Sequence, residues 1–392
     1  MAQRRPPKKR LRSWRSEAFR GVVYQVVALA GVALAVWFLA HNTLENMRVR
    51  GIQSGFGFLP EPAGFDIGES VFDYESNRPY WVAFAVGLAN TLRVAIAGIV
   101  FCTVIGTLVG VGRFSHNALV RGACRVYVEA FRNIPVLIQL LTWYLLFAEL
   151  LPPITEALHL APGVWVSKSG VSFPVPVWEA GQLYAGLGLL AGLLAGWLWR
   201  RRARLRFERT AQPGSMVLAP LAIVLALAVL GWLAGGAPTA MDWPQKGELI
   251  VEGGGSVTPE FMALLLGLSI YTSTFVAEVV RAGIQSVSQG QAEAAQALGL
   301  SSRQEMRLIL IPQALRVIIP PLTNQYLNLT KNSSLAVAVG YPDLVSIGNT
   351  ALNQTGRAVE CIAIIMAVYL TTSLATSALM NWYNARAAIK ER

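Results

Sequence analysis

Apolar residues fall into eight long stretches that alternate with polar loops. Each stretch is close to the roughly 20 residues that an α-helix needs to cross the hydrocarbon core of a bilayer. The stretches cover about residues 22–40, 83–112, 127–150, 181–199, 216–234, 261–286, 313–330 and 359–381. This pattern predicts an all-α membrane protein with about eight transmembrane helices.

Composition supports a membrane protein. The chain of 392 residues is 54% hydrophobic and only 14% charged, whereas soluble proteins carry about 25% charged residues. The first stretch, 22–40, is longer than the roughly 7–15-residue core of a signal peptide, so we expect it to be retained as a helix. Three cysteines in or beside apolar stretches indicate no disulfide framework.

Loop charges predict the orientation of the chain. Eight of the first twenty residues are Arg or Lys, loop 113–125 has three Arg and no acid, and run 200–209 has six Arg. Loop 41–81 instead holds six acids against three Arg. Because basic loops stay in the cytoplasm, both termini are expected there. A basic N-terminus can also bind nucleic acid or acidic lipid, but before an apolar span it marks a cytoplasmic end.

The spans differ in character, which suggests a core and additions. We expect the second, third, sixth, seventh and eighth spans to form the core, and glycines in 181–199 and at Gly106 and Gly110 to be packing positions. The expected layout is a basic N-terminus (1–21), first helix (22–40), outer loop (41–81), first core part (82–150), insertion with two extra helices (151–260), second core part (261–384) and tail (385–392).

Segment 288–312 is polar although it lies between two apolar spans. Ser288 and Ser302 fit the capping-box pattern that begins a helix, and Gly299 fits the position just past a helix end. The second short helix is expected to stop at Pro312. Small residues around one acid, Glu293, suit a groove on another protein, but a solvated loop helix fits equally well.

Polar side chains inside the spans are costly, and they usually face a cavity or one another. In the sixth span, Thr274, Glu278 and Arg281 share one helical face, either as a static Glu278–Arg281 clamp or as a pathway lining. Residues 330–334 (TKNSS) suit a carboxylate ligand, although a snorkelling helix end is the alternative.

The third span has a proline at position 135, which would kink the helix. Carbonyls freed at such a kink are tolerated where they line a cavity, so Gln139 is a pathway candidate, with simple packing as the alternative. Asn90 and Thr91, at the start of the second span, are assigned to the same cavity.

Nothing in the chain indicates catalysis. No G-x-x-x-x-G-K-[ST] stretch and no H-E-x-x-H stretch occurs, and the three histidines are scattered. We therefore expect no catalytic residue, no metal site and no bound cofactor, and an energy source outside this chain.

Several motifs together resemble a known family. The stretch EAAQALG (293–299), followed by ILIP (309–312), looks like the EAA loop of ABC importer permeases. TFVAEVVRAGIQSVSQGQ, NQYLNLTKNSSLA, LANTLRVA and FRNIPVLIQL extend the resemblance to polar amino-acid permeases of the histidine/glutamine/arginine type. The added first span, long loop and insertion resemble the larger subunit of general L-amino-acid and glutamate/aspartate systems.

The resemblance implies a multi-pass subunit of the inner membrane that imports amino acids. Its partners would be a cytoplasmic ATPase dimer that binds ATP and Mg²⁺, a second permease, a periplasmic binding protein and membrane lipid, but no nucleic acid. The implied coupling residues are Glu293, Ala294, Ala295 and Gly299. The candidate pathway residues are Asn90, Thr91, Gln139, Thr274, Glu278, Lys331, Asn332, Ser333 and Ser334.

Two other classes of membrane protein would show different sequence features. A gradient-driven transporter favours inverted repeats and ionisable groups at mid-membrane positions, and no clear repeat is visible. A scaffold protein would leave the EAA loop and the polar helix faces without a purpose. A homodimer also remains possible, although the resemblance favours a heterodimer.

Overall fold

The computed structural model describes residues 17–49, 51, 54–210, 215, 217–247 and 250–387. The chain forms two compact units, one from Met1–Phe131 and Thr272–Arg392 and the other from Arg132–Tyr271. Helices dominate both units, but the second also contains short strands.

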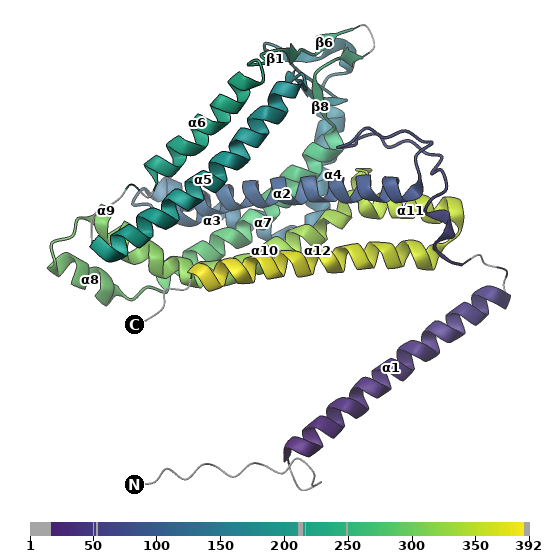
Figure 1. Ribbon diagram of the computed structural model, residues 1–392, viewed down its shortest axis with the longest axis horizontal. Helices are drawn as coiled ribbons and strands as arrows, with labels where there is room; N and C mark the ends of the chain where they lie inside the picture. The colour runs from purple at the N-terminus through teal and green to yellow at the C-terminus, as the bar shows by residue number, and fades with distance from the viewer. Residues whose placement is uncertain are drawn as a thin grey trace. The chain divides into compact units, whose positions relative to one another are not determined.

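The first unit is a bundle of long helices joined by shorter ones. α2 packs against α10 and α11, and both of these pack against α12 (Figure 1). The helices of this unit, with α3 and α7 reaching into the second, are α1 (Glu17–Val49), α2 (Tyr80–Gly112), α3 (Ala118–Asn133), α7 (Pro259–Gln285), α8 (Gln289–Ala297), α9 (Ser302–Glu305), α10 (Ile311–Asn332), α11 (Leu344–Thr355) and α12 (Ala358–Ala387).

Glycines bring three of these helices together. A β-carbon built on Gly106 of α2 would lie 2.6 Å from Val276 of α7, and one on Gly283 of α7 would lie 2.2 Å from Ile318 of α10. Only glycine permits such close contact between helices. The prediction that Gly106 and Gly110 are packing positions is confirmed, since a β-carbon on Gly110 would lie 2.8 Å from the Ala277 carbonyl oxygen.

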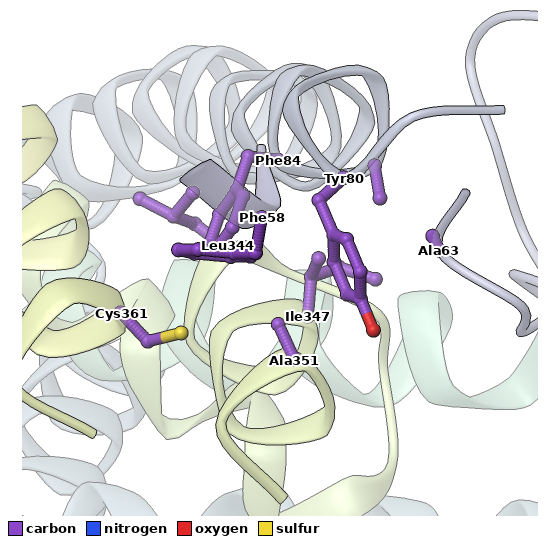
Figure 2. Close-up of a cluster of buried hydrophobic side chains, with 9 residues drawn as sticks. Phe58, Ala63, Tyr80, Phe84, Leu344, Ile347, Ala351 and Cys361 are labelled. Carbon is purple, nitrogen blue, oxygen red and sulfur yellow. The ribbon is translucent and has the colours of Figure 1, made fainter. Parts of the chain in front are cut away.

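Residues 54–79, which we call the strap, are folded onto the core of the first unit. The strap begins with a 3-10 turn, Phe56–Phe58, and Phe58 is 1% exposed. Figure 2 shows Phe58, Tyr80 and Phe84 gathered over Leu344 and Ile347 of α11. Full burial of a side chain the size of phenylalanine contributes on the order of 2–3 kcal/mol, so this cluster is a substantial part of the core.

Polar contacts hold the two ends of the strap. The Gly55 amide donates to the Glu360 carboxylate, and the Arg357 guanidinium lies 5.4 Å from the centre of the Phe58 ring. At the other end, the hydroxyl of Tyr80 donates to Gln354 at 2.9 Å. The second half of the predicted 41–81 loop is therefore part of the packed core.

The second unit contains α4 (Val136–Leu150), a small sheet and a helical hairpin. The main sheet has the order β1-β2-β3-β8 and is antiparallel throughout. Its strands are β1 (Leu158–Ala161), β2 (Val164–Ser167), β3 (Gly170–Phe173) and β8 (Gly255–Val257), and the paired short strands are β4 (Val175–Pro176) with β5 (Met241–Asp242) and β6 (Gln245–Lys246) with β7 (Val251–Glu252).

The predicted all-α class is therefore wrong within the 151–260 insertion. Its strands are two to four residues long, too short for an alternating pattern to stand out. Their turns depend on glycines in the left-handed region, such as Gly163 (φ 71°) and Gly170 (φ 113°). The chain is mostly helical, not purely so.

Two helices of the insertion, α5 (Ala180–Thr210) and α6 (Leu218–Ala234), form a long antiparallel pair (Figure 1). A β-carbon on Gly188 would lie 2.3 Å from the Leu227 carbonyl oxygen, and one on Gly231 would lie 2.3 Å from the Tyr184 carbonyl oxygen. The prediction that the glycines of 181–199 serve close helix packing is confirmed.

In the described part of the chain, six helices are long and apolar enough to span a membrane. The bent pair α3 and α4 makes a seventh, with a bend of 103° at the break around Pro135. The predicted kink at this proline is confirmed. The predicted span 216–234 coincides with α6, which at 17 residues is shorter than the others, so a count of eight stays a prediction.

Candidate functional site

The polar segment 288–312 contains a short helix, α8, with a defined end. The Leu300 amide bonds to the Ala295 carbonyl at 3.1 Å, and the Gly299 amide bonds to the Gln296 carbonyl at 2.9 Å. These two bonds form a Schellman motif, which requires a left-handed residue. Gly299 has φ +72°, so its predicted role just past the helix end is confirmed.

The start of α8 matches the prediction in position, but its cap differs. Ser288 is the N-cap residue, yet its side chain makes no capping hydrogen bond. In the next helix the capping contact lies one residue earlier than predicted, because the Ser301 amide and hydroxyl both donate to Gln304 Oε1, at 2.9 and 2.8 Å. The pair Ser301–Gln304 thus replaces the predicted Ser302–Glu305.

The predicted helix stop at Pro312 is wrong. α9 continues through a π-helical turn, Met306–Leu310, directly into α10. Pro312 is the second residue of α10. It directly follows the π-helical turn, where the helix already departs from regular i→i−4 bonding and can accommodate the missing amide hydrogen. The α9 part of the loop is therefore continuous with a span, and α8 contacts it at the π-helical turn.

The surface of α8 is divided between exposed and buried positions. Glu293, Ala294 and Gly299 are exposed, but Ala295 is fully buried. Leu298, at the C-terminal end of the helix, is 78% exposed. An exposed leucine beside small residues and a single acid suits contact with another protein. Sequence reasoning missed Leu298, although its apolar side chain in a polar segment was the available signal.

A charged cluster joins α2 to α7 near the start of the loop. Arg281 Nε donates to Glu278 Oε2 at 2.8 Å, so the predicted pairing is confirmed. Arg113 contacts the other carboxylate oxygen of Glu278. Sequence reasoning missed Arg113 because it lies 165 positions away. Because both arginines bind its carboxylate, Glu278 links α2 to α7. This contact is the clamp that was predicted as the alternative to a pathway role.

One turn earlier on α7, Thr274 is fully buried. Its neighbour Ser273 lies 2.7 Å from the Tyr127 hydroxyl of α3. Thr274 therefore belongs to the packed interior of the first unit.

Asn90 and Thr91 contact the segment that leads into α11. Asn90 Nδ2 donates to the Glu69 carbonyl at 2.8 Å and to the Pro342 carbonyl at 2.9 Å. The Thr91 hydroxyl accepts from the Leu344 amide at 3.1 Å. Both side chains are buried. They hold the strap and the start of α11 against α2.

Asp343 is at the centre of this polar cluster. Its carboxylate caps α11 by accepting from the Ser346 amide at 2.8 Å, and it accepts from the Tyr369 hydroxyl at 3.3 Å. Burial raises the pKa of the Asp343 carboxyl to about 6, although the hydrogen bonds from the Ser346 and Val345 amides and the Tyr369 hydroxyl lower it. The Asp343 carboxyl therefore gains or loses its proton at a pH not far below neutral.

The residues of the predicted TKNSS cluster (330–334) differ in burial and in the groups that they bind. Ser333 is buried, and its hydroxyl donates to the Thr330 carbonyl at 2.7 Å, while Ser334 donates to the Lys331 carbonyl at 2.8 Å. Asn332 is half-buried and Lys331 is exposed. Two of the predicted donors are thus used to close the end of α10.

Lys331 and Ser334 line a groove of about 500 Å³, which we call the Lys331 groove. The remaining lining residues come from α11 and α12 and are Val345, Ile365, Met366, Tyr369, Leu370 and Ser373. One ammonium group and the Ser373 hydroxyl over an apolar floor can hold a carboxylate and bury an apolar side chain. Tyr369 also connects this groove to Asp343.

Gln139 belongs to the second unit, apart from the other candidates. It is 3% exposed, and its Nε2 donates to the Ile134 carbonyl at 3.0 Å, just before Pro135. Gln139 therefore satisfies a carbonyl at the break between α3 and α4. This contact is the packing alternative for Gln139.

Arg316 is a further residue that sequence reasoning passed over. It lies inside α10, four residues before Pro320, and its buried Nε has no hydrogen-bond partner among the described residues. An arginine within a membrane span is a functional candidate by default. Its signal was the single charge in an apolar stretch.

A chain whose described residues include several helices long and apolar enough to cross a membrane is a multi-pass membrane protein. Residues 102–389 match the protein family described as "Binding-protein-dependent transport system inner membrane component", and the chain belongs to this family of permeases. The predicted membership in the ABC importer permeases is therefore confirmed.

Similar proteins cover nearly the whole chain. The general L-amino acid transport system permease protein AapQ of Rhizobium johnstonii is 45% identical over 95% of this chain and 94% of its own. The putative amino-acid ABC transporter permease protein YhdX of Escherichia coli K12 is 42% identical over the full length of both. The glutamate/glutamine/aspartate/asparagine permease BztB of Rhodobacter capsulatus is 38% identical over 95% of each chain.

A solved structure is also similar. The crystal structure of an amino acid ABC transporter with histidines has 21% sequence identity and a TM-score of 0.47, covering 78% of this chain and 95% of that chain.

Proposed function

We propose that this chain is the membrane-spanning subunit of an ATP-driven importer that carries amino acids across the inner membrane. The observation that carries the proposal is the family match over residues 102–389, together with whole-length relatives that are amino-acid permeases. The fold agrees, because polar side chains gather beside spans that are otherwise apolar.

The 288–312 loop is the proposed contact with a separate cytoplasmic ATPase dimer. Glu293, Ala294 and Leu298 form the exposed side of α8, and Gly299 sets the turn that follows. Ala295 lies beneath and holds the helix in place. ATP and Mg²⁺ would be bound by the ATPase, so this chain is a transport subunit and not an enzyme.

Movement would pass from α8 into the spans. The π-helical turn and α10 follow the loop without a break, and Gly283 keeps α7 within van der Waals contact of α10. Rotation of α8 by the ATPase would therefore move α7 and α10 together. We propose that this motion opens the pathway alternately to each side of the membrane.

The Lys331 groove is the proposed point of contact with the amino acid. Lys331 would hold the α-carboxylate of the substrate and the Ser373 hydroxyl would donate to it, while the Tyr369 oxygen, whose hydrogen is donated to Asp343, would accept from the α-ammonium group. Asn332, Ser333 and Ser334 would keep the shape of this region. Asn90, Thr91, Thr274 and Glu278 would brace the helices of the first unit, and Gln139 would brace the break at Pro135 in the second.

The remaining partners follow from the same proposal. A second, similar permease would complete the membrane part as a heterodimer, and a periplasmic binding protein would deliver the substrate. Both termini would lie in the cytoplasm, as the basic loops favour. We keep α6 as an eighth membrane helix, because its 17 residues nearly reach the length required.

The decisive experiment is uptake by the reconstituted complex. Glu293→Arg and Leu298→Glu should reduce uptake by about 30-fold, since loss of an interface anchor costs on the order of 2 kcal/mol. Membrane insertion should stay normal, and less ATPase should be recovered with the chain. The matched control is Glu75→Arg, the same charge reversal on an exposed residue of the strap.

A pull-down from native membranes gives an independent test. We expect a Walker-motif ATPase and a second permease to copurify with the chain. Normal uptake by both α8 variants, or recovery of the chain alone after crosslinking, would contradict the proposal.

A further inference from the structure

The α5–α6 hairpin opens at one end. A β-carbon built on the three α5 glycines that face α6 at four-residue spacing measures how closely α6 approaches. The nearest α6 atom lies 2.3 Å away at Gly188, 2.8 Å at Gly192 and 3.2 Å at Gly196. The two backbones therefore separate steadily toward the end of α5 that carries its arginine run.

A groove of about 430 Å³ occupies the space where the helices separate. Each helix contributes residues at positions i, i+3, i+4 and i+7, which form one continuous face. The lining is Leu193, Gly196, Trp197 and Arg200 from α5, and Val217, Pro220, Leu221 and Val224 from α6. All walls are apolar except at Arg200, so the groove suits an apolar chain attached to an anion.

Arginines surround the open end of this groove. The run 200–209 contains six arginines, and Arg200 is itself a lining residue. The Arg201 guanidinium lies 5.7 Å from the centre of the Trp197 ring, so a cation–π contact holds it beside the groove. Arg200 therefore lines the apolar walls, and Arg201 is held beside them by Trp197.

We infer that this groove binds an acidic phospholipid, with an acyl chain between α5 and α6 and the phosphate on Arg200 and Arg201. Guanidinium groups bind phosphate through paired hydrogen bonds. The arginine run marks the cytoplasmic leaflet, which is the leaflet that carries anionic lipid, and basic pockets between spans on that side suit such headgroups. The tryptophan ring lies at the level of the headgroups, where this side chain is enriched.

The lipid would also stabilise the hairpin. Among the described residues, the extensive contacts of α5 and α6 are with each other, and many of their leucines are exposed. A lipid chain in the groove would fill the space that the diverging backbones leave. The inference concerns the insertion alone and does not depend on which substrate the permease carries.

The test uses the full-length chain in mild detergent. Bound lipid is counted by native mass spectrometry during titration with phosphatidylglycerol and, separately, with phosphatidylcholine. We expect phosphatidylglycerol to bind more tightly. The double variant Arg200→Gln/Arg201→Gln should weaken its binding by about fivefold for each arginine removed. Leu221→Trp, which fills the groove, should also weaken it.

Two controls separate a built site from general attraction. Arg206→Gln/Arg209→Gln removes the same charge farther along α5, and Leu225→Trp adds the same bulk on α6 outside the groove. Both should bind phosphatidylglycerol within about twofold of the parent chain. Equal binding of the two lipids, equal losses for the two arginine pairs, or unchanged binding by Leu221→Trp would each overturn the inference.

Discussion

Asp343 connects three parts of the first unit through one side chain. It caps α11, accepts from Tyr369 of α12, and follows the segment that Asn90 of α2 holds. A carboxyl buried in this way is favoured in its neutral form, because burial penalises charge. The same group therefore fixes the local fold and makes it depend on pH.

Asp343 should make the chain less stable as pH rises from about 4 to about 6. Its folded pKa, about 6, is above the ordinary value of 3.8, so the folded state holds the proton more tightly. This contribution, about 3 kcal/mol at about 1.4 kcal/mol per unit of pKa, is present below pH 4 and lost above pH 6. Asp343→Asn should lose it.

Thermal unfolding of the purified chain at pH 4 and pH 7 measures this effect. From pH 4 to pH 7 the stability of Asp343→Asn should rise relative to that of the parent chain. Asp73→Asn, a change at an exposed residue of the strap, should show no such rise. Equal pH dependence in the parent and Asp343→Asn would rule out the buried carboxyl as the cause.

Thr91→Val tests the contact between α2 and α11. Valine keeps the shape but leaves the Leu344 amide without the hydroxyl that accepts from it at 3.1 Å. An unsatisfied buried donor costs about 1–3 kcal/mol, and the melting temperature should fall accordingly. Thr371→Val is the control, because the exposed Thr371 hydroxyl bonds only within its own helix, and it should change stability by less than about 0.5 kcal/mol.

The sequence revealed which of these residues are polar, but not what they bind. Asn90, Thr91 and Ser333 were predictable as costly groups inside spans. The partners of Asn90 and Thr91, at Pro342 and Leu344, lie about 250 positions away along the chain, and no local pattern records such a contact. Arg113 was missed for the same reason.

Glycines allow helices in the first unit to pack closely, because glycine has no side chain. Gly106 allows α2 to contact α7, and Gly283 allows α7 to contact α10. The spacing of Gly106 and Gly110 was visible in the sequence as repeated small residues, whereas Gly283 was not predicted as a packing position. The π-helical turn before α10 was not visible, because proline usually marks a boundary and here it occupies the first turn of the continuing helix.

Gly106→Ala should destabilise the chain although alanine favours helices. The new β-carbon would lie 2.6 Å from the Val276 side chain and 2.7 Å from the Ser273 carbonyl oxygen. Overpacking of this kind costs about 1–3 kcal/mol. Gly122→Ala in α3 meets nothing within 4 Å and should be neutral or slightly stabilising. Thermal unfolding of the two variants side by side decides the point.

Gly299→Val should disturb the coupling loop through its backbone alone. No atom lies within 4 Å of the position of a new β-carbon, but φ is +72°, which costs a β-branched residue roughly 1–2 kcal/mol. Gly299→Asn, which tolerates this region, is the matched variant. We expect uptake to fall with valine and to survive with asparagine, while stability in detergent changes little in either. Equal uptake by both would show that the turn is dispensable.

At the scale of the whole molecule, hydropathy predicted the arrangement of spans well. Each predicted span coincides with an apolar helix, with the third broken at Pro135 and the fifth shorter than the rest. The small sheet of the insertion was missed because its strands carry too few residues for a repeating pattern. Hydrophobicity records burial in lipid, whereas the strands depend on glycine turns and pairing between distant segments.

Cysteine labelling in whole cells tests the orientation. In a chain without its three native cysteines, Asp73→Cys and Lys168→Cys should react with a membrane-impermeant maleimide. His116→Cys and Arg202→Cys should react only after permeabilisation, because basic loops remain inside. All four positions are exposed on the protein. Labelling of Arg202→Cys before permeabilisation would contradict the prediction that this end of α5 lies in the cytoplasm, and would reverse the predicted orientation of α5 and α6.

The strap has a consequence for how the core of the first unit opens. A helix of 12 residues such as α11 is marginal on its own, and here the strap, α2 and α12 enclose it. Its amide hydrogens should therefore exchange with deuterium slowly, and only when those neighbours separate. The exchange rate of this single helix would then report how often the strap, α2 and α12 separate from it.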